Sequence, residues 1–175
     1  MKNFGPIMAD DLRTRRKEFD QASFDGLRCD KRRIGLVGCV SKKNSTPQAA
    51  KNLYVSTLFS GRRSYVERSC SEWWILSAEH HLVHPSKILA PYDLALKDLG
   101  RPDRRFWSRQ VLFAIDERIC PNRDDTFEIH AGGEYRDFGL SDGLRERGCL
   151  VEVPTEGQRI GEQLRFYNQA RESQF

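Results

Sequence analysis

Four short, mainly apolar runs recur along the chain and have the length of strands. They span residues 34–40, 73–76, 126–131 and 150–153. The first run is apolar throughout apart from two glycines, which is typical of a central strand covered on both faces. The runs therefore predict four strands of one sheet, with the first strand in its interior.

Between and after these runs, apolar residues recur at helical spacing. Such stripes are formed by Phe59, Val66 and Cys70, by Trp107, Val111, Ile115 and Ile119, by Leu140 and Leu144, and by Ile160, Leu164 and Tyr167. Pro102 suits a first helical turn, and Gly148 suits the end of a helix. Alternating strands and helices predict an α/β fold: a mainly parallel sheet of four or five strands, with helices on both faces.

The first 30 residues do not share this alternation. Residues 10–19 have the pattern of a short charged helix, with Leu12 and Phe19 on one stripe. Residues 23–30 contain Gly26 and no period, which is typical of a linker. We therefore expect an N-terminal helical extension and linker over residues 1–30 and a single α/β domain over residues 31–175.

Composition excludes some classes of protein. The hydrophobic content of 38% indicates a globular chain rather than a disordered one. No apolar run approaches the roughly 20 residues that cross a bilayer, and the N-terminus lacks the apolar segment of a secretory signal. A cytoplasmic protein without membrane contact is expected. Basic residues concentrate in the first third of the chain, which indicates either nucleic-acid binding or a solvated surface.

Cysteine and histidine spacing favours neither a metal nor a cofactor. The five cysteines are Cys29, Cys39, Cys70, Cys120 and Cys149, and no two of them form a CxxC pair. Free thiols, several of them buried, are expected. His80 and His84 have i,i+4 spacing, but Pro85 follows and no HExxH motif is present. We expect a hydrogen-bonding role for these loop histidines.

Reactive polar residues follow each predicted strand. They are Cys39, Ser41, Lys42 and Lys43 after the first; Ser77 and His80, then Tyr92 and Asp93, after the second; His130, Gly132, Glu134, Tyr135 and Arg136 after the third; and Thr155 and Glu156 after the fourth. Ligands of open parallel sheets bind beyond the carboxyl ends of the strands. We call the segments that follow the four strands their exits. Together the four exits predict a ligand site at the carboxyl edge of the sheet.

Each exit also has a structural interpretation. Ser41 and Lys42 can offer a hydrogen-bond donor and a point charge to a phosphate, or form an ordinary polar turn without P-loop spacing. Asp93 can orient water or stabilise positive charge, or cap a turn. Gly132 and Glu134 can bring backbone N–H groups and a second carboxylate to a ligand, or form a tight turn at a helix start.

Several short blocks together resemble a bacterial family of small domains. They are GCVSKK at 38–43, LYVSTLF at 53–59, ILSA at 75–78, PYD at 91–93 and EIHAG at 128–132. That family is similar to YaaA-like DNA-binding proteins and to phage-defence DNA glycosylases that remove modified bases, and the resemblance spans about residues 34–166. One departure is visible: the family has Lys and Gly where this chain has Glu79 and His81.

The resemblance implies a DNA glycosylase that hydrolyses the N-glycosidic bond of a modified base in phage DNA. Asp93 or Glu134 would then stabilise the oxocarbenium-like sugar or position water, and Lys42 would contact phosphate or attack C1′. Candidate substrate contacts are the tyrosines Tyr54, Tyr92 and Tyr135, with Ser56, Ser77, His80, His130 and Arg136. The alternatives are a non-catalytic nucleic-acid binder and an enzyme that acts on a free nucleotide or nucleoside.

Overall fold

A five-stranded sheet forms the centre of the protein. The computed structural model describes residues 31–172, so the extension and linker expected over residues 1–30 lie outside the described part. The strands are β1 (Arg33–Gly38), β3 (Glu72–Ser77), β4 (His81–Val83), β6 (Thr126–His130) and β7 (Leu150–Glu152), in the spatial order β4-β3-β1-β6-β7. All neighbouring strands are parallel except β3 and β4. The predicted α/β fold with a mainly parallel sheet is confirmed.

Strand β1 lies in the interior of this sheet, as its sequence predicts. Ile34, Leu36 and Val37 are completely buried. A Cβ atom added at Gly35 would lie 2.7 Å from Cγ1 of Val66, so a side chain at this position would collide with the helix above it. The glycine therefore lets that helix pack directly against the backbone of β1.

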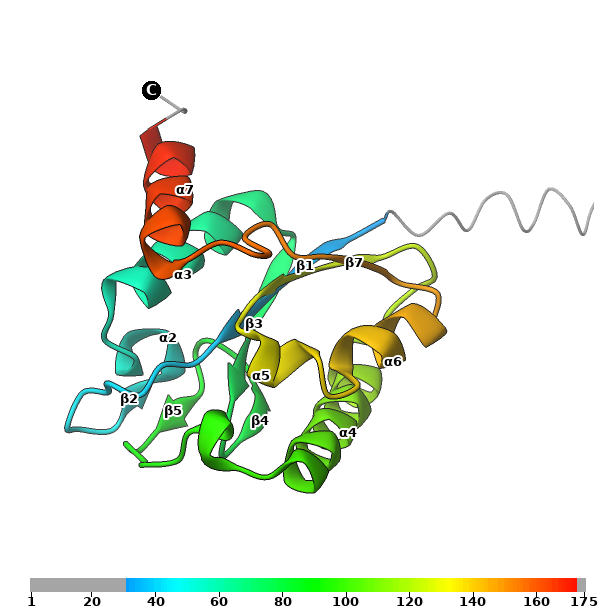
Figure 1. Ribbon diagram of the computed structural model, residues 1–175, viewed down its shortest axis with the longest axis horizontal. Helices are drawn as coiled ribbons and strands as arrows, with labels where there is room; N and C mark the ends of the chain where they lie inside the picture. Colours follow the sequence, from blue (N-terminus) through cyan, green and yellow to red (C-terminus); the bar gives the residue numbers. More distant parts are fainter. Residues whose placement is uncertain (1–30, 173–175) are drawn as a thin grey trace, which may run out of the picture. The chain divides into compact units, whose positions relative to one another are not determined.

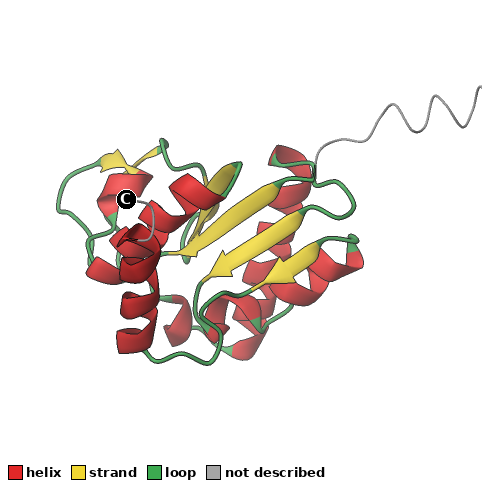
Figure 2. Cartoon of the chain, turned by 90° about the horizontal axis from the view of Figure 1, so that it is seen from above, coloured by secondary structure: helices red, strands yellow, loops and turns green. Residues whose placement is uncertain are grey.

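Helices cover both faces of the sheet (Figure 1). Helices α3 (Thr57–Ser69) and α7 (Ile160–Glu172) pack together on one face, and α4 (Arg101–Arg118) and α6 (Leu140–Glu146) pack together on the other. Seen from above, the parallel strands β3, β1, β6 and β7 run in the same direction between these layers (Figure 2). Within residues 31–172, no helix is both long and apolar enough to cross a membrane.

The apolar stripe predicted for the last helix is only partly buried. Tyr167 is buried against Gly61 of α3, at 3.0 Å from the position of a Cβ atom at that glycine. Ile160, in contrast, is 66% exposed, and Leu164 is half-buried. The expectation that Ile160 is a core residue is therefore wrong, because this first residue of α7 borders an open cavity instead of packing into the core.

Several short elements lie outside the predicted alternation. They are β2 (Gln48–Ala49) and β5 (Ile88–Leu89), which form a separate two-stranded sheet, the short helices α2 (Ala50–Leu53) and α5 (Gly133–Arg136), and the 3-10 helix η1 (Leu96–Asp98). Strand β4 was also not predicted. Its three residues return antiparallel beside β3, with Ser77 paired to His81. A segment this short carries no periodic signal.

Candidate functional site

The connections that leave β1 and β6 diverge at the carboxyl edge of the sheet. The chain after β1 leads to α3 and then to β3 on one side, whereas the chain after β6 leads through α5 and α6 to β7 on the other side. Such a switch point opens a crevice between neighbouring strand ends, and open α/β sheets bind their ligands there. This is the edge at which the polar exits predict a site.

A cavity of about 380 Å³ opens at this point, and we call it the exit pocket. It is lined by Cys39, Val40 and Ser41 after β1, by Gly132, Glu134 and Tyr135 after β6, by Leu58 and Arg62 of α3, by Ala95, Leu96 and Lys97 at η1, and by Ile160 and Gln163 of α7. The pocket therefore brings together five of the residues predicted for the site: Cys39, Ser41, Gly132, Glu134 and Tyr135. Its volume suits a small organic ligand.

Two buried groups from different strand exits meet at the pocket wall. The thiol of Cys39 lies 3.1 Å from the hydroxyl oxygen of Tyr135, which also donates to the Cys39 carbonyl oxygen at 3.4 Å. The indole of Trp107 packs edge-on against the tyrosine ring, with 5.5 Å between the ring centroids. Burial, followed by the nearby Cys39, raises the pKa of Tyr135 far above its ordinary value. The hydroxyl is therefore neutral at physiological pH.

Glu134 supplies the carboxylate of the exit pocket. It lies in the first turn of α5, is half-buried, and makes no hydrogen bond or ion pair with any residue between 31 and 172. Its carboxylate folds back over Gly132, where any Cβ atom would collide with it. Gly132, which was predicted to allow close backbone approach, thus leaves room for the Glu134 carboxylate. That carboxylate remains available to a ligand.

Arg62 is a pocket residue that the sequence analysis did not identify. Its side chain is only 7% exposed, and its Nη2 donates to Oε1 of Gln163 at 2.9 Å. The Tyr167 hydroxyl lies near the guanidinium, and Nε has no hydrogen-bond partner among the described residues. Burial lowers the pKa of Arg62, against smaller opposing effects from Tyr167 and Glu134. One signal was present: Arg62 lies between Phe59 and Val66, on the buried stripe of α3.

A second group of predicted residues forms a hydrogen-bonded tyrosine cluster. The hydroxyls of Tyr54 and Tyr92 lie 2.9 Å apart, and the Tyr92 hydroxyl lies 2.8 Å from Oγ of Ser77. That Oγ also accepts the backbone N–H of His80, and Nζ of Lys43 lies 4.1 Å from the centroid of the Tyr92 ring. Burial raises the pKa of Tyr54 to about 12 and that of Tyr92 still further.

Cys39 lies near both the tyrosine cluster and the exit pocket. For both Tyr54 and Tyr92, the nearby Cys39 is the second cause of the raised pKa after burial. The same thiol is hydrogen-bonded to Tyr135 at the pocket. The exits after β1, β3 and β6 are therefore close neighbours, and neutral hydroxyl groups predominate around the central thiol.

Three predicted contact residues have structural partners outside the pocket. Ser56 caps α3, with its Oγ accepting the backbone N–H of Phe59 at 3.0 Å. His130 is completely buried, and its Nδ1 lies 2.8 Å from the Tyr167 hydroxyl. Arg136 forms an ion pair with Glu156, a residue of the exit after β7. These three side chains therefore stabilise the elements around the pocket and do not line it.

Asp93 and Lys42, which were also predicted for the site, are both exposed. Asp93 is exposed and does not line the exit pocket, although Ala95 of the same loop does. Lys42 is also exposed, and its backbone carbonyl accepts the N–H of Val55 at 2.9 Å. Of the two carboxylates that the sequence left open, Glu134 is the one within the pocket.

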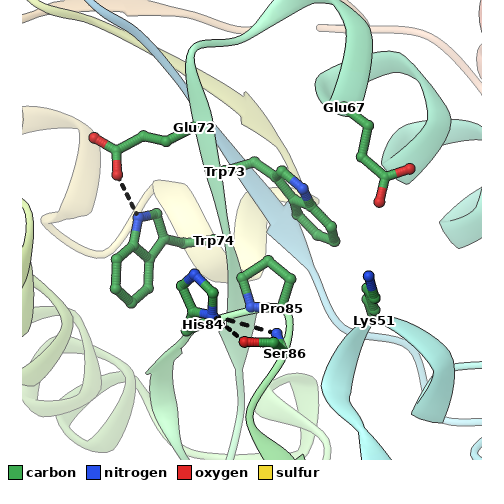
Figure 3. A pocket seen from close by; sticks show the side chains of 8 residues that line it. All are labelled: Lys51, Glu67, Glu72, Trp73, Trp74, His84, Pro85 and Ser86. Carbon is green, nitrogen blue, oxygen red and sulfur yellow. Dashed lines mark hydrogen bonds between the residues drawn. The ribbon is translucent and has the colours of Figure 1, made fainter.

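A smaller cavity of about 280 Å³ lies at the other end of β3 (Figure 3). Its histidine, His84, lies edge-on to the Trp74 ring and 2.7 Å from Oγ of Ser86. The Trp74 indole N–H donates to Glu72 at 3.2 Å. The predicted hydrogen-bonding role is therefore found for His84, and residues 31–172 contain no cluster of three or more histidine, cysteine, aspartate or glutamate side chains that would hold a metal ion.

Part of the basic bias of the first third is neutralised within the fold. Arg32 pairs with Asp125 at 2.7 Å, and Arg33 pairs with the buried Glu128 at 3.0 Å. These pairs stand at or near the amino ends of β1 and β6, opposite the exit pocket. The charges of Arg32 and Arg33 are thus committed to the fold, whereas Lys42 lies exposed beside the site.

The fold and the pocket together define a doubly wound α/β protein with a cavity at the switch point of its sheet, where folds of this class bind their ligands. Residues 34–169 match a family of unknown function, DUF6884, and the chain belongs to this family. Every residue that lines the exit pocket lies within the matched segment. No curated protein and no solved structure matches the chain.

Proposed function

We propose that the protein is a DNA glycosylase that hydrolyses the N-glycosidic bond of a modified base, with phage DNA as its target. The observation that carries this proposal is the Glu134 carboxylate, which lines a nucleoside-sized pocket at the switch point and has no partner within residues 31–172. The sequence resemblance to phage-defence glycosylases supports the same reaction. Neither argument requires a metal or a cofactor.

The reaction needs a negative charge beside the sugar. Cleavage of an N-glycosidic bond builds positive charge on C1′ and its ring oxygen, and Glu134 would stabilise that charge or deprotonate the attacking water. The water adds to C1′ as the bond between C1′ and the base nitrogen breaks. The proton of that water passes to Glu134 and from there, directly or through solvent, to the departing base, so the carboxylate is regenerated. The Tyr135 hydroxyl and the Cys39 thiol at the pocket wall would hydrogen-bond the base.

The surroundings of the pocket suit a nucleotide turned out of a DNA strand. An extruded base enters an enclosed pocket and is recognised by hydrogen bonds and by contact with apolar or aromatic side chains. Leu58, Leu96 and the exposed Ile160 supply apolar walls. The exposed Lys42 at the exit from β1 would contact backbone phosphate outside the pocket.

Base release from phage DNA tests the proposal. The protein would be incubated with DNA of phages that carry different modified bases and with matched unmodified DNA, and released bases would be identified by mass spectrometry alongside abasic-site counting. Release of one modified base by the wild type, but not by Glu134→Gln, is the expected result. Binding without release from every DNA tested would instead make the protein a non-catalytic nucleic-acid binder.

A further inference from the structure

Three charged residues within the described part are less than one-tenth exposed: Arg62, Asp125 and Glu128. Two of them are neutralised by ion pairs, Asp125 by Arg32 and Glu128 by Arg33. Arg62 has no ion pair with any residue from 31 to 172. An unpaired buried charge is strongly unfavourable, so buried charges are normally paired. The fold therefore contains a buried cation without its own counter-charge.

The side chains that hold Arg62 orient it without neutralising it. Gln163 accepts a hydrogen bond from Nη2, and the Tyr167 hydroxyl lies near the guanidinium. Tyr167 is in turn 2.8 Å from Nδ1 of His130, whose pKa is lowered to about 3 by burial and then by the charges of Arg62 and Arg33. All three neighbours are thus neutral at physiological pH, and the arginine keeps its full charge.

Arg62 and Glu134 line the same cavity from different elements. The arginine comes from α3, which lies between β1 and β3 in the chain, and the glutamate comes from α5, which follows β6. They attract one another but do not form an ion pair. The space between them can receive a ligand that is anionic at one end and develops positive charge at the other. Within a nucleotide, the phosphate and C1′ have this relationship.

We propose that Arg62 is the phosphate-binding residue of the exit pocket. The anion site rests on the proposed function in one respect, since it takes the exit pocket to be where the substrate binds. Arginine presents planar N–H donors that match phosphate oxygens, and Arg62 lines the pocket with a charge that no residue from 31 to 172 neutralises in an ion pair. The phosphate belongs either to the backbone of an extruded DNA nucleotide or to a free nucleoside monophosphate.

Binding measurements without turnover test this site. Calorimetric titrations would measure the affinity for each nucleoside 5′-monophosphate and for the corresponding nucleoside. They would also measure the affinity for a short single-stranded oligonucleotide and for the same oligonucleotide with one neutral methylphosphonate linkage. In the wild type, the phosphate should strengthen binding at least about 10-fold, as expected for charge-assisted hydrogen bonds. In Arg62→Gln this advantage should fall to about 2-fold or less.

Arg63→Gln is the matched control, because Arg63 is the next residue and pairs at the surface with Glu67. It should keep the phosphate advantage. If Arg62→Gln does not fold, Arg62→Lys decides, since a point charge would retain only part of the advantage. If the phosphate strengthens binding only in the oligonucleotide, the phosphate that Arg62 binds belongs to the DNA backbone. If it strengthens binding of the monophosphate, the ligand is a free nucleotide. An advantage that is equal in wild type and Arg62 variants, or absent from both ligand types, overturns the proposal, whether or not any base is released.

Discussion

The thiol of Cys39 lies 3.1 Å from the hydroxyl of Tyr135, although the two residues are 96 positions apart in the chain. Cys39 is the first residue after β1, and Tyr135 lies in the helix that follows β6. Their contact fixes the two divergent connections to each other at the switch point. The geometry of the exit pocket therefore depends on a bond between exactly the segments that a ligand would touch.

A double-mutant cycle should measure this coupling. Tyr135→Phe and Cys39→Ala each remove one partner, and each should lower the free energy of unfolding by about 1 kcal/mol through the lost hydrogen bond, with some added packing loss for the cysteine. Their combined effect should be smaller than the sum by at least about 0.5 kcal/mol. Chemical denaturation measures all four proteins, and strictly additive effects would show that the contact carries no energy.

The two candidate carboxylates should differ sharply in a base-release assay. Glu134→Gln removes the charge inside the exit pocket and should lower the rate of base release by about 100-fold or more. Asp93→Asn changes an exposed side chain outside the pocket and should leave the rate within about 3-fold of wild type. A larger loss for Asp93→Asn than for Glu134→Gln would move the reacting centre to the η1 loop.

Apolar runs predicted the sheet because its central strands are buried on both faces. Burial on both faces requires the continuous apolar sequence of residues 34–37. Small and polar residues can follow only where the strand ends and leaves the buried interior. The edge at which the site lies was therefore predictable. Strand β4 was not, since three residues of an edge hairpin have no distinctive pattern.

Which side chains line the exit pocket depends on contacts between segments that are far apart in the sequence, and local sequence patterns do not predict such contacts. Whether Asp93 or Glu134 enters the pocket depends on how the loop before η1 is folded, and no spacing rule determines that. Arg62 was overlooked because an arginine in a helix is usually solvated. Its position three residues after Phe59 and four before Val66 indicated the buried stripe, but only the packing of α7 shows that its charge is enclosed.

Acid should destabilise the protein through His130. The pKa of this histidine is lowered to about 3 in the fold, chiefly by burial, against an ordinary value of 6.5. Between these values the unfolded chain binds a proton that the folded protein does not, so stability falls as the pH is lowered. Each unit below 6.5 should reduce the free energy of unfolding by about 1.4 kcal/mol from this residue.

Urea denaturation between pH 7.5 and 4.5 measures the effect. His130→Gln keeps a hydrogen-bonding group near Tyr167 and should give a flatter pH dependence than the wild type. His81, whose pKa burial also lowers, contributes in the same direction and should account for part of the remaining slope. Parallel curves for wild type and His130→Gln would contradict the buried neutral state.

A glycine at position 81 should stabilise the β3–β4 hairpin. His81 has φ of 59°, a left-handed conformation that side chains adopt at a cost of roughly 1 kcal/mol. His81→Gly removes that cost, and the greater freedom of glycine in the unfolded chain offsets part of it, for a net gain of about 0.5 kcal/mol. His84→Gly, at an ordinary backbone conformation, should destabilise the protein by about 1 kcal/mol. Thermal unfolding of both variants provides the comparison, and a lower Tm for His81→Gly would refute the strain.

Lysine substitutions at opposite ends of β1 should separate a DNA-facing edge from the rest of the surface. Lys42 is exposed at the carboxyl end beside the exit pocket, whereas Lys31 is exposed at the amino end, 3.9 Å from Asp124. If Lys42 contacts a phosphate, Lys42→Ala should weaken DNA binding for every sequence and reduce the slope of log affinity against log salt by about 1. Lys31→Ala should leave that slope unchanged. Fluorescence anisotropy with labelled DNA at several salt concentrations makes the comparison, and equal slopes for Lys42→Ala and wild type would place the DNA backbone away from the exit of β1.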